Sequence, residues 1–477
     1  MTSTPSTRHT VAIVLAAGAG SRFGGGKLLA SLEGRPVLQH VLDRLAEAGM
    51  TEVVVVLGND AAAIETSIDW RAERRVPNDD PRRGLSSSVR VGIEALDATA
   101  GAALIVLGDQ PLVSVAAIRE LLAAPDDAAR PIVVPVYADD RGRNPVRLGR
   151  SAFGLVGETV GDRGLGPVIA AHPELVQEIT IDEPGGNPDI DTRADLVGLL
   201  EAAWAARVRE NAAQVDRFRE VPDGTDFYAP VTGLFRADPT RTDEPALDVL
   251  LKHIGPGEHW LDIGAGAGRY ALPLARVLGS SGGAVTAVDP SESMLAALRE
   301  IAVEHGIDNV RAVEVRWPPG DLAPFAADVA LIAHVGYDIE AIGPFVAAME
   351  SVARRSCVAM LMERQPSSIA DVCWPPVHGE ARVSLPALPE FVELLQGLGR
   401  TPTVERVDRQ PRRFDSRDEL AGFLRRQLWI EPGGAADGRF QAALDELMEI
   451  DPDGRVGLIG QQPLPIGIVT WIPGGSG

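Results

Sequence analysis

The sequence predicts an α/β protein with two tandem three-layer α/β/α domains. Its apolar runs are rich in valine and isoleucine and are continuous, which is typical of strands that are buried on both faces. Helical segments separate these runs, as expected where helices cover both sides of a sheet. The 477 residues exceed the roughly 250 to 300 at which a single core usually stops growing, so two domains are expected.

The first half of the chain alternates strands with helices. The expected strands are residues 11–18, 51–58, 102–111 and 130–137. The expected helices are residues 37–49, 86–98 and 114–124. Such alternation predicts a largely parallel sheet, and ligands of such sheets bind at the carboxyl ends of the strands.

The same alternation restarts after residue 255, which indicates a second sheet. The expected strands there are residues 259–266, 284–290, 310–315, 327–334 and 356–362. The expected helices are residues 271–279, 291–306 and 416–429.

A helical stretch, residues 196–221, joins the two patterns, and a segment marked by proline and glycine, residues 221–230, follows it. We therefore place the domain boundary near residue 205. The expected parts are a first domain at 1–205, a helical connector at 206–240 and a second domain at 241–477.

The composition favours small-molecule chemistry in the cytoplasm. A formal charge of −22 disfavours nucleic acid or an anionic membrane as partner. No apolar run approaches the roughly 20 residues that span a bilayer, and the first residues lack the apolar region of a secretory signal. Two cysteines, Cys357 and Cys373, are too few for a disulfide framework.

A glycine-rich loop, Leu15 to Lys27, follows the first expected strand and suits a polyphosphate. Its glycines let backbone N–H groups turn inward, and Arg22 and Lys27 supply positive charge. Lys27 is one of only two lysines in the chain, which suggests a need for a compact point charge. Leu28 stands where a Walker A loop has a hydroxyl, so that motif is excluded. A flexible glycine turn with incidental charges is the alternative.

Carboxylates are expected near this loop. Asp109 ends an apolar strand, so it emerges at the same sheet edge and can hold Mg²⁺ through oxygen. Asp189 and Asp191 lie two residues apart, which puts both on one face of an extended segment. Either can complete the metal site, and the alternative for Asp189 is a helix cap or a loop acid.

Two further segments are candidates for substrate contacts. Ser86, Ser87 and Ser88 open a helix, so their hydroxyls and free N–H groups suit a nucleotide, although simple N-capping explains them equally well. Asp162 and Arg163 suit contact with the acceptor substrate, although a solvated salt bridge in a loop is the alternative.

The loop resembles the signature of the molybdenum cofactor cytidylyltransferases, within the wider nucleotidyltransferase superfamily. Five further segments between residues 11 and 197 resemble family motifs and follow the family's order. They are Gly84–Val89, Gly108–Pro111, Asn144–Val146, Gly161–Gly164 and Asp189–Thr192. With this many ordered matches, a chance glycine turn is a poor explanation.

The resemblance implies a Rossmann-like nucleotidyltransferase domain and roles for individual residues. The residues implied for nucleotide binding are Leu15, Ala16, Ala17, Gly18, Gly20, Ser86, Ser87 and Ser88. Those implied for catalysis are Lys27, Arg22 and Asp109, with Asp109 and Asp191 as the Mg²⁺ ligands.

The implied reaction is in-line attack of an acceptor phosphate on the α-phosphorus of CTP, with release of pyrophosphate. The resemblance implies molybdenum-bound molybdopterin as acceptor, the cytosine dinucleotide form as product and a molybdoenzyme as receiver of that product. Related guanylyltransferases usually carry L-A-G-G at the position of Leu15 to Gly18, so L-A-A-G favours CTP.

A second constellation opens the second domain. A strand carries Asp262 and turns through Gly264, Gly266 and Gly268 into a helix, and the next strand ends in Asp289. An acid at the tip of the second strand suits hydrogen bonds to ribose hydroxyls.

This pattern resembles the class I S-adenosylmethionine-dependent methyltransferases over roughly residues 225 to 365. It implies a second Rossmann-like domain in which the glycines approach the methionyl part of S-adenosylmethionine and Asp289 holds the ribose. A tight strand-to-helix turn without a ligand is one alternative. A dinucleotide-binding oxidoreductase is another, disfavoured because the glycines lack the G-x-x-G spacing.

Later segments of the second domain are less specific. Trp317 lies where this family contacts adenine, and His334 lies at the expected catalytic edge, where it is either a general base or a packed residue. Residues 465–473 suit the last antiparallel strand of this fold. The methyl acceptor does not follow from the sequence.

Three other functions remain open. The first domain can transfer another nucleotide, such as GMP, to another phosphorylated acceptor. The second can be a binding module without turnover. The whole chain can be a chaperone that delivers finished cofactor, although retention of Lys27 and Asp109 favours turnover.

Overall fold

The computed structural model describes residues 9–18, 20–138, 142–182, 188–221, 236 and 238–474. It forms two compact units, Met1–Gly198 and Leu199–Gly477. Their boundary falls inside helix α6 (Arg193–Phe218). Residues 222–235 and 237 of the expected connector lie outside the described residues.

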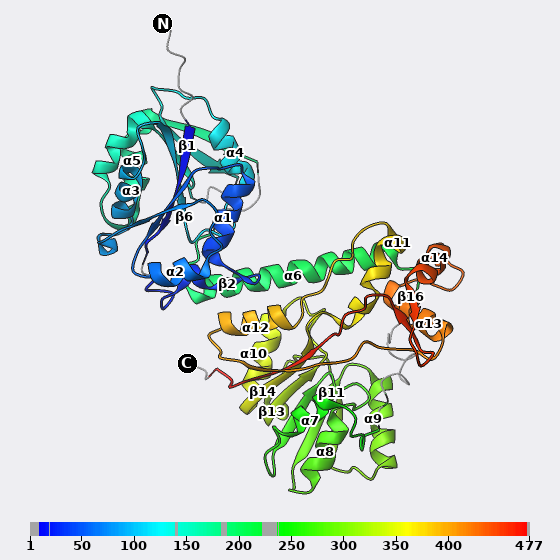
Figure 1. Ribbon diagram of the computed structural model, residues 1–477. Coiled ribbons are helices and arrows are strands. Elements are labelled where there is room, and N and C mark those ends of the chain that lie inside the picture. Colours follow the sequence, from blue (N-terminus) through cyan, green and yellow to red (C-terminus); the bar gives the residue numbers. More distant parts are fainter. Residues whose placement is uncertain are drawn as a thin grey trace. The chain divides into compact units, whose positions relative to one another are not determined.

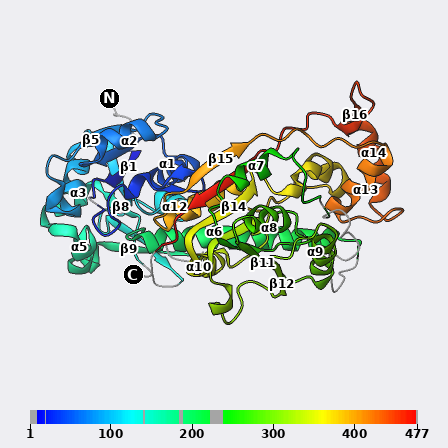
Figure 2. The ribbon, with the colours of Figure 1, turned by 90° about the horizontal axis from the view of Figure 1, so that it is seen from below.

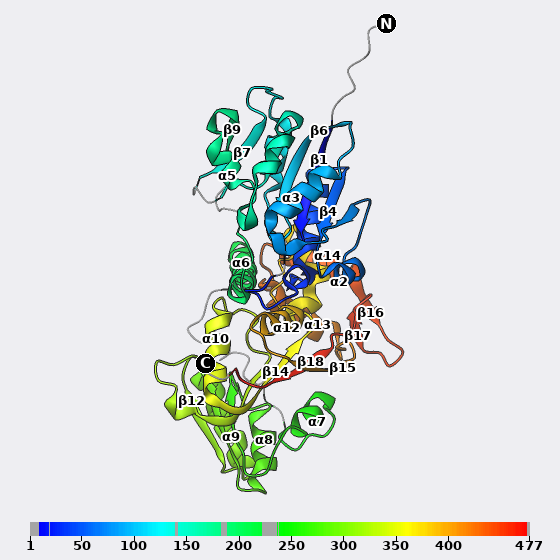
Figure 3. The ribbon, with the colours of Figure 1, turned by 90° about the vertical axis from the view of Figure 1, so that its left-hand side faces the viewer.

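The first unit contains a seven-stranded sheet in the order β5-β4-β1-β6-β8-β7-β9. Its strands are β1 (His9–Ala16), β4 (Val53–Leu57), β5 (Arg74–Pro77), β6 (Ala100–Leu107), β7 (Ile132–Tyr137), β8 (Val146–Gly149) and β9 (Val176–Ile181). Only β8 runs against its neighbours in this sheet. Figure 3 shows β7 and β9 side by side at one end of it. A separate short ladder joins β2 (Ser31–Leu32) and β3 (Arg35–Pro36).

Helices cover both faces of this sheet, as the continuous apolar strands require (Figure 1). One face packs against α1 (Val37–Glu47), α2 (Ala61–Ser67) and α4 (Val115–Ala123). The other packs against α3 (Leu85–Glu94), α5 (Gly166–Ala171) and the 3₁₀ helix η3 (Arg150–Glu158). Inward side chains of β1 alternate between the two cores, with Ile13 on the α3 side and Val14 on the α1 side.

Strand register brings three strand ends to one edge of the first sheet. Ala16 of β1 pairs with Leu57 of β4, and Leu15 pairs with Leu107 of β6. The loops that follow β1, β4 and β6 therefore begin side by side. The glycine-rich loop and Asp109 leave the sheet at this edge.

The second unit has a seven-stranded sheet in the order β12-β11-β10-β13-β14-β18-β15. Its strands are β10 (His259–Ile263), β11 (Ala284–Asp289), β12 (Val310–Glu314), β13 (Ala327–Ala333), β14 (Ala353–Met362), β15 (Thr403–Val407) and β18 (Ile466–Trp471). Strands β10 to β14 are parallel, and β18 is antiparallel to both of its neighbours. The expectation of a last antiparallel strand is thus confirmed, as is the α/β class of both units.

Helices α7 (Pro245–Leu251), α8 (Ala271–Gly279) and α9 (Glu292–Glu304) share a core with one face of the second sheet. Helices α10 (Ile342–Val352) and α12 (Leu388–Gly397) also belong to this unit, and Phe391 of α12 meets Trp471 of β18. Beyond the sheet, a smaller core gathers α11 (Trp374–His378), α13 (Arg417–Leu428), α14 (Asp437–Leu447) and the 3₁₀ helix η8 (Pro366–Cys373). Figure 2 shows α13 and α14 near β16 (Met448–Ile450), which pairs with β17 (Val456–Leu458) in a short antiparallel ladder.

None of the helices in the described part of the chain combines the length and apolar character needed to cross a lipid bilayer.

Candidate functional sites

The glycine-rich loop of the first unit folds back on itself just before Lys27. The N–H groups of Gly24 and Gly25 both donate to the carbonyl of Gly20, each at 3.1 Å. Gly24, Gly25 and Gly26 have φ of 92°, 92° and 66°, a conformation that residues with a Cβ rarely adopt. The turn returns the chain to the sheet edge, where a short 3₁₀ helix, Lys27–Leu29, begins.

Lys27 lies between two carboxylates that are far apart in the sequence. Its Nζ donates to Oδ2 of Asp109 at 2.5 Å and to Oδ1 of Asp191 at 3.4 Å. Burial opposes the charge on this lysine, but Asp109 and Asp191 outweigh that effect and raise its pKa. Arg22 reaches Oδ2 of Asp191 at 3.4 Å and stays 77% exposed. The structure therefore brings Lys27, Arg22, Asp109 and Asp191 together.

Asp189 lies in a different environment from Asp191. The side-chain amide of Gln110 donates to Oδ1 of Asp189 at 2.5 Å. Burial raises the pKa of Asp189, and the charges of Asp109 and Asp191 raise it further. The hydrogen bond from Gln110 lowers this pKa but does not cancel the increase. Gln110 belongs to the Gly108–Pro111 motif, but its role could not be predicted, because its partner Asp189 is almost 80 residues away in the sequence.

The three serines of helix α3 use their hydroxyls within the fold. Ser86 and Ser88 are buried. The amide of Asn78 donates to Oγ of Ser87 at 2.8 Å and to Oγ of Ser88 at 3.1 Å. Helix α3 starts at Leu85, without a side-chain cap, so the serines are not N-caps.

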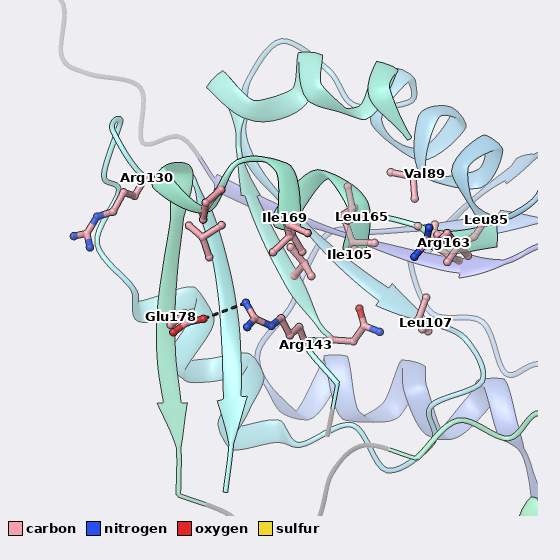
Figure 4. Close-up of a pocket in the computed structure, with 18 residues that line it drawn as sticks. Leu85, Val89, Ile105, Leu107, Arg130, Arg143, Arg163, Leu165, Ile169 and Glu178 are labelled. Atoms are coloured by element: carbon pink, nitrogen blue, oxygen red, sulfur yellow. Dashed lines mark ion pairs between the residues drawn. The ribbon is translucent and has the colours of Figure 1, made fainter. Parts of the chain in front are cut away.

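A cavity of about 990 Å³ lies on the α3 and α5 face of this unit (Figure 4). Its apolar wall includes Leu15 and Leu107, at the carboxyl ends of β1 and β6. The charged residues of its lining are Arg130, Arg143, Arg163 and Glu178. Arg143 pairs with Glu178 at 3.1 Å, as the dashed line in Figure 4 shows. The cavity thus combines apolar walls with an excess of positive charge.

In the second unit, the turn from β10 to α8 is held by the tip of β11. The N–H groups of Gly264 and Ala265 donate to the carbonyl of Val288 at 2.8 and 3.0 Å. The N–H of Gly266 donates to Oδ2 of Asp289 at 2.9 Å. The predicted glycines and Asp289 therefore form one connected turn.

Asp262 is buried beneath this turn, and its Oδ1 has no hydrogen-bond partner among the described residues. Burial and the nearby charge of Asp289 raise the pKa of Asp262 to about 7. An added Cβ on Gly266 would have no heavy atom within 4 Å, so its backbone is open to a ligand. A buried carboxyl in need of a partner, beside open backbone, fits a polar and cationic ligand such as S-adenosylmethionine.

A charged network follows the glycine turn directly. The carboxylate of Glu244 accepts hydrogen bonds from Arg241 at 2.7 Å, from Arg269 at 2.6 Å and from the Tyr270 hydroxyl at 2.8 Å. Burial opposes ionisation of Glu244, but these partners lower its pKa. Sequence reasoning missed Glu244, since nothing in its segment marks it as a site residue.

Of the less specific candidates, His334 lies beside the charged network, and Trp317 follows β12 (Val310–Glu314), whose last residue pairs with Asp289. His334 directly follows β13, and its ring centroid is 6.2 Å from that of Tyr270. Trp317 is buried and packs edge-on against Phe325.

The described residues contain no group of three or more His, Cys, Asp or Glu side chains arranged to hold a metal ion. Two carboxylates, Asp109 and Asp191, instead converge on the Lys27 ammonium. Such a pair suits Mg²⁺, which proteins usually bind through one or two carboxylates together with substrate phosphates.

Each unit is thus an α/β fold that gathers its candidate residues at the edge formed by the carboxyl ends of its parallel strands. Comparison with known families agrees. Residues 12–176 match the family model described as MobA-like NTP transferase domain, and residues 261–355 match the model described as Methyltransferase domain. Through its first unit, the chain belongs to the MobA-like NTP transferases, and its second unit carries a methyltransferase domain.

Two curated relatives illustrate the range of this similarity. Nicotine blue oxidoreductase of Paenarthrobacter nicotinovorans is 31% identical over 194 residues, which cover 39% of this chain and 95% of that protein. The bifunctional protein GlmU of Sorangium cellulosum is 33% identical over 159 residues, 32% of this chain and 33% of GlmU. The chain therefore spans about a third of the length of such GlmU relatives.

Among solved structures, Rv0371c of Mycobacterium tuberculosis is 31% identical and superposes with a TM-score of 0.37, covering 41% of this chain and 98% of that one.

Proposed function

We propose that the first unit transfers a cytidylyl group from CTP to a phosphorylated acceptor, with molybdenum-bound molybdopterin as the acceptor that the resemblance favours. The observation that carries this proposal is the position of Lys27 between Asp109 and Asp191, beside an amide-rich turn. A metal triphosphate needs carboxylates that bind the metal ion and a cation that offsets the charge of the phosphates, and Asp109, Asp191 and Lys27 supply both.

In this proposal Asp109 and Asp191 hold Mg²⁺, and Asp189 does not. Asp189 accepts the amide of Gln110 and has a raised pKa, whereas Asp191 faces Lys27 and Arg22. When bound, Mg²⁺ supplies positive charge against the triphosphate oxygens. Lys27 then moves from the carboxylates to the phosphates.

The residues of the chain mainly position the reactants and neutralise charge. An oxygen of the acceptor phosphate forms a bond to the α-phosphorus, the bond from that phosphorus to the β-phosphate oxygen breaks, and pyrophosphate leaves. Lys27 and Arg22 offset the negative charge on the phosphates, and loop amides donate to them. The cavity with Arg143 and Arg163 supports an anionic acceptor that has an apolar body.

For the second unit we propose methyl transfer from S-adenosylmethionine to a separate acceptor, giving S-adenosylhomocysteine, the methylated acceptor and a proton. The unpartnered Oδ1 of Asp262, the open backbone of Gly266 and the acid at Asp289 support this binding site. Gly264 and Gly268 complete the turn.

An oxidoreductase is the second candidate for the first unit, because one relative carries that name. The charges at Lys27, Asp109 and Asp191 favour phosphate chemistry over it. Transfer of a guanylyl group remains the nearest variant, since these charges do not select a base.

Pyrophosphate release tests the proposal directly. The full chain is incubated with Mg²⁺, molybdenum-bound molybdopterin and each of the four nucleoside triphosphates in turn. We expect CTP to give the highest rate. Pyrophosphate from GTP alone would replace the cytidylyl assignment, and no pyrophosphate from any nucleotide would reject nucleotidyl transfer to this acceptor.

A further inference from the structure

One edge of the second sheet gathers the segments that follow β13, β14 and β15. Met362, the last residue of β14, and Val407, the last residue of β15, both pair with Ile466 of β18. Neighbouring strands lie roughly 4.8 Å apart, so the ends of β14 and β15 lie on the order of 10 Å apart. These ends share the edge of the sheet that carries the glycine turn after β10.

Two arginines at this edge form no hydrogen bond or ion pair in the described part of the chain. Arg364 follows β14 and Arg409 follows β15, both exposed, and neither forms a hydrogen bond or ion pair with another described residue. The charge of Arg364 does act on the carboxyl of Asp371, but without an ion pair between them. Nearby arginines differ from them: Arg406 pairs with Glu363 at 3.5 Å, and Arg413 pairs with Glu449 at 2.8 Å. In a chain of net charge −22, unpaired cations at a ligand-binding edge provide a local site for an anion.

His334 lies between these arginines and the glycine turn in the strand order. It has a φ of 60°, unusual for a residue other than glycine, and its N–H donates to the carbonyl of Met360 at 2.8 Å. Its Nδ1 is buried without a partner among the described residues. Burial and the charges of Arg409 and Arg269 lower the pKa of His334 to about 4, so the ring is neutral near pH 7.

Gln365 adds a second unsatisfied group. Its side chain is 1% exposed, and neither its amide nitrogen nor its amide oxygen has a partner in the described part of the chain. Buried amides are normally hydrogen-bonded, because an unpaired one costs roughly 1 to 3 kcal/mol. Strain at His334 and unsatisfied polar atoms at both residues therefore mark the same edge as a ligand site.

We infer that the methyl acceptor of the second unit is a small organic anion whose carboxylate or phosphate binds Arg364 and Arg409, while His334 and Gln365 contact its polar groups nearer the methyl donor. This inference rests on the proposed methyl transfer. The charges are complementary, since Asp262 and Asp289 line the donor site and arginines line the acceptor site.

Calorimetric titration of the full chain, saturated with S-adenosylhomocysteine, tests the inference. Benzoate and phenyl phosphate serve as anionic probes, and benzamide is the neutral match of benzoate. We expect both anions to bind at least ten times more tightly than benzamide. Benzamide that binds as well as benzoate, or anions that do not bind, would overturn the inference.

Variants separate this site from general surface charge. Arg409→Gln and Arg364→Gln should each weaken benzoate binding at least fivefold. Arg276→Gln, an exposed and likewise unpaired arginine in the last turn of α8, should leave it unchanged. Equal effects of Arg409→Gln and Arg276→Gln would contradict the proposed contact.

Failure of the methyltransferase proposal can be distinguished from failure of the acceptor assignment. If S-adenosylhomocysteine itself does not bind, that proposal fails, and the same titrations without it still test Arg364 and Arg409. If it binds and the anions do not, only the acceptor assignment fails.

Discussion

Lys27 connects the carboxylates of the first site to its glycine loop. The structure buries most of its side chain and raises its pKa through Asp109 and Asp191, so the ammonium stays charged at any physiological pH. A charge held at this edge lies next to the place that the proposal assigns to the triphosphate.

Replacement of Lys27 should therefore cost more activity than replacement of Arg22. For Lys27→Gln we expect pyrophosphate release to fall by roughly 100-fold or more, as for the loss of one group that stabilises developing charge. Arg22→Gln should lower the rate only about tenfold, because Arg22 is 77% exposed and its charge is screened. Equal losses in the two variants would contradict the difference in their roles.

Asp262 should make the stability of the second unit depend on pH. Its pKa is about 7 in the folded chain and about 3.9 in the unfolded one, so the folded state holds the extra proton. The stability that this proton provides is present below pH 4 and is lost as the pH rises through 7.

Asp262→Asn removes this dependence. We expect the variant to gain stability over the natural protein between pH 5 and pH 8, by up to roughly 4 kcal/mol. Urea unfolding followed by tryptophan fluorescence measures this difference in stability. The signal reports mainly on the second unit, because six of the seven tryptophans lie there and only Trp70 lies in the first unit. A difference that does not change with pH would show that Asp262 titrates normally.

At the scale of elements, two features restrict which residues fit the turn from β10 to α8, namely the positive φ of its glycines and the close approach of Val335 to Gly264. Gly264 has a φ of 74°, and an added Cβ would lie 2.5 Å from Val335. Gly266 also has a positive φ, 54°, but an added Cβ there would meet no heavy atom within 4 Å.

These two glycines give a matched pair of variants. Gly264→Ala should lower the free energy of unfolding more than Gly266→Ala, which should lose only about 1 to 2 kcal/mol through its backbone conformation. Both should weaken binding of S-adenosylhomocysteine, measured by calorimetry. A Gly266→Ala variant that binds normally would mean that the turn does not face the ligand.

The sequence predicts the central strands of both sheets well, because a strand buried on two faces leaves a continuous apolar run. Strands β9, with the sequence VQEITI, and β15, with TVERV, escape prediction because neither forms a continuous apolar run. Strand β12, with VRAVE, is also mixed, but it is expected because it continues the alternation of strands and helices.

The residues of the candidate sites likewise fall into those that the sequence predicts and those that it does not. Asp109 and Asp289, at or just after strand ends, and Lys27, in the loop that follows β1, could be predicted as neighbours of their sites because parallel strands bring their ends to one edge. The contact of Gln110 with Asp189, and that of Glu244 with Tyr270, depend on tertiary structure and have no local signal. Ser86, Ser87 and Ser88 lie in the first turn of α3 as predicted, but the hydrogen bonds of their hydroxyls within the fold have no local signal in the sequence.

At the scale of the whole molecule, two complete cores support two separate sites. The first unit and the second unit each enclose their own buried clusters around their own sheet. The candidate residues described for each site belong to one unit. We therefore expect the two activities to be independent of each other.

Cross-tests of the two units should show this independence. We expect Asp109→Asn to leave the affinity for S-adenosylhomocysteine within about twofold of the natural value, and Asp289→Ala to leave pyrophosphate release unchanged. Calorimetry and the pyrophosphate assay measure the two. A loss of S-adenosylhomocysteine binding in Asp109→Asn would indicate coupling that the separate cores do not explain.

The central claim is that Asp109 and the glycine loop hold one metal triphosphate, and calorimetric titration of CTP with and without Mg²⁺ tests it most directly. In the natural protein, Mg²⁺ should tighten CTP binding at least tenfold. In Asp109→Asn that gain should disappear while binding without the metal persists. An Asp109→Asn variant with the full Mg²⁺-dependent gain would contradict the account.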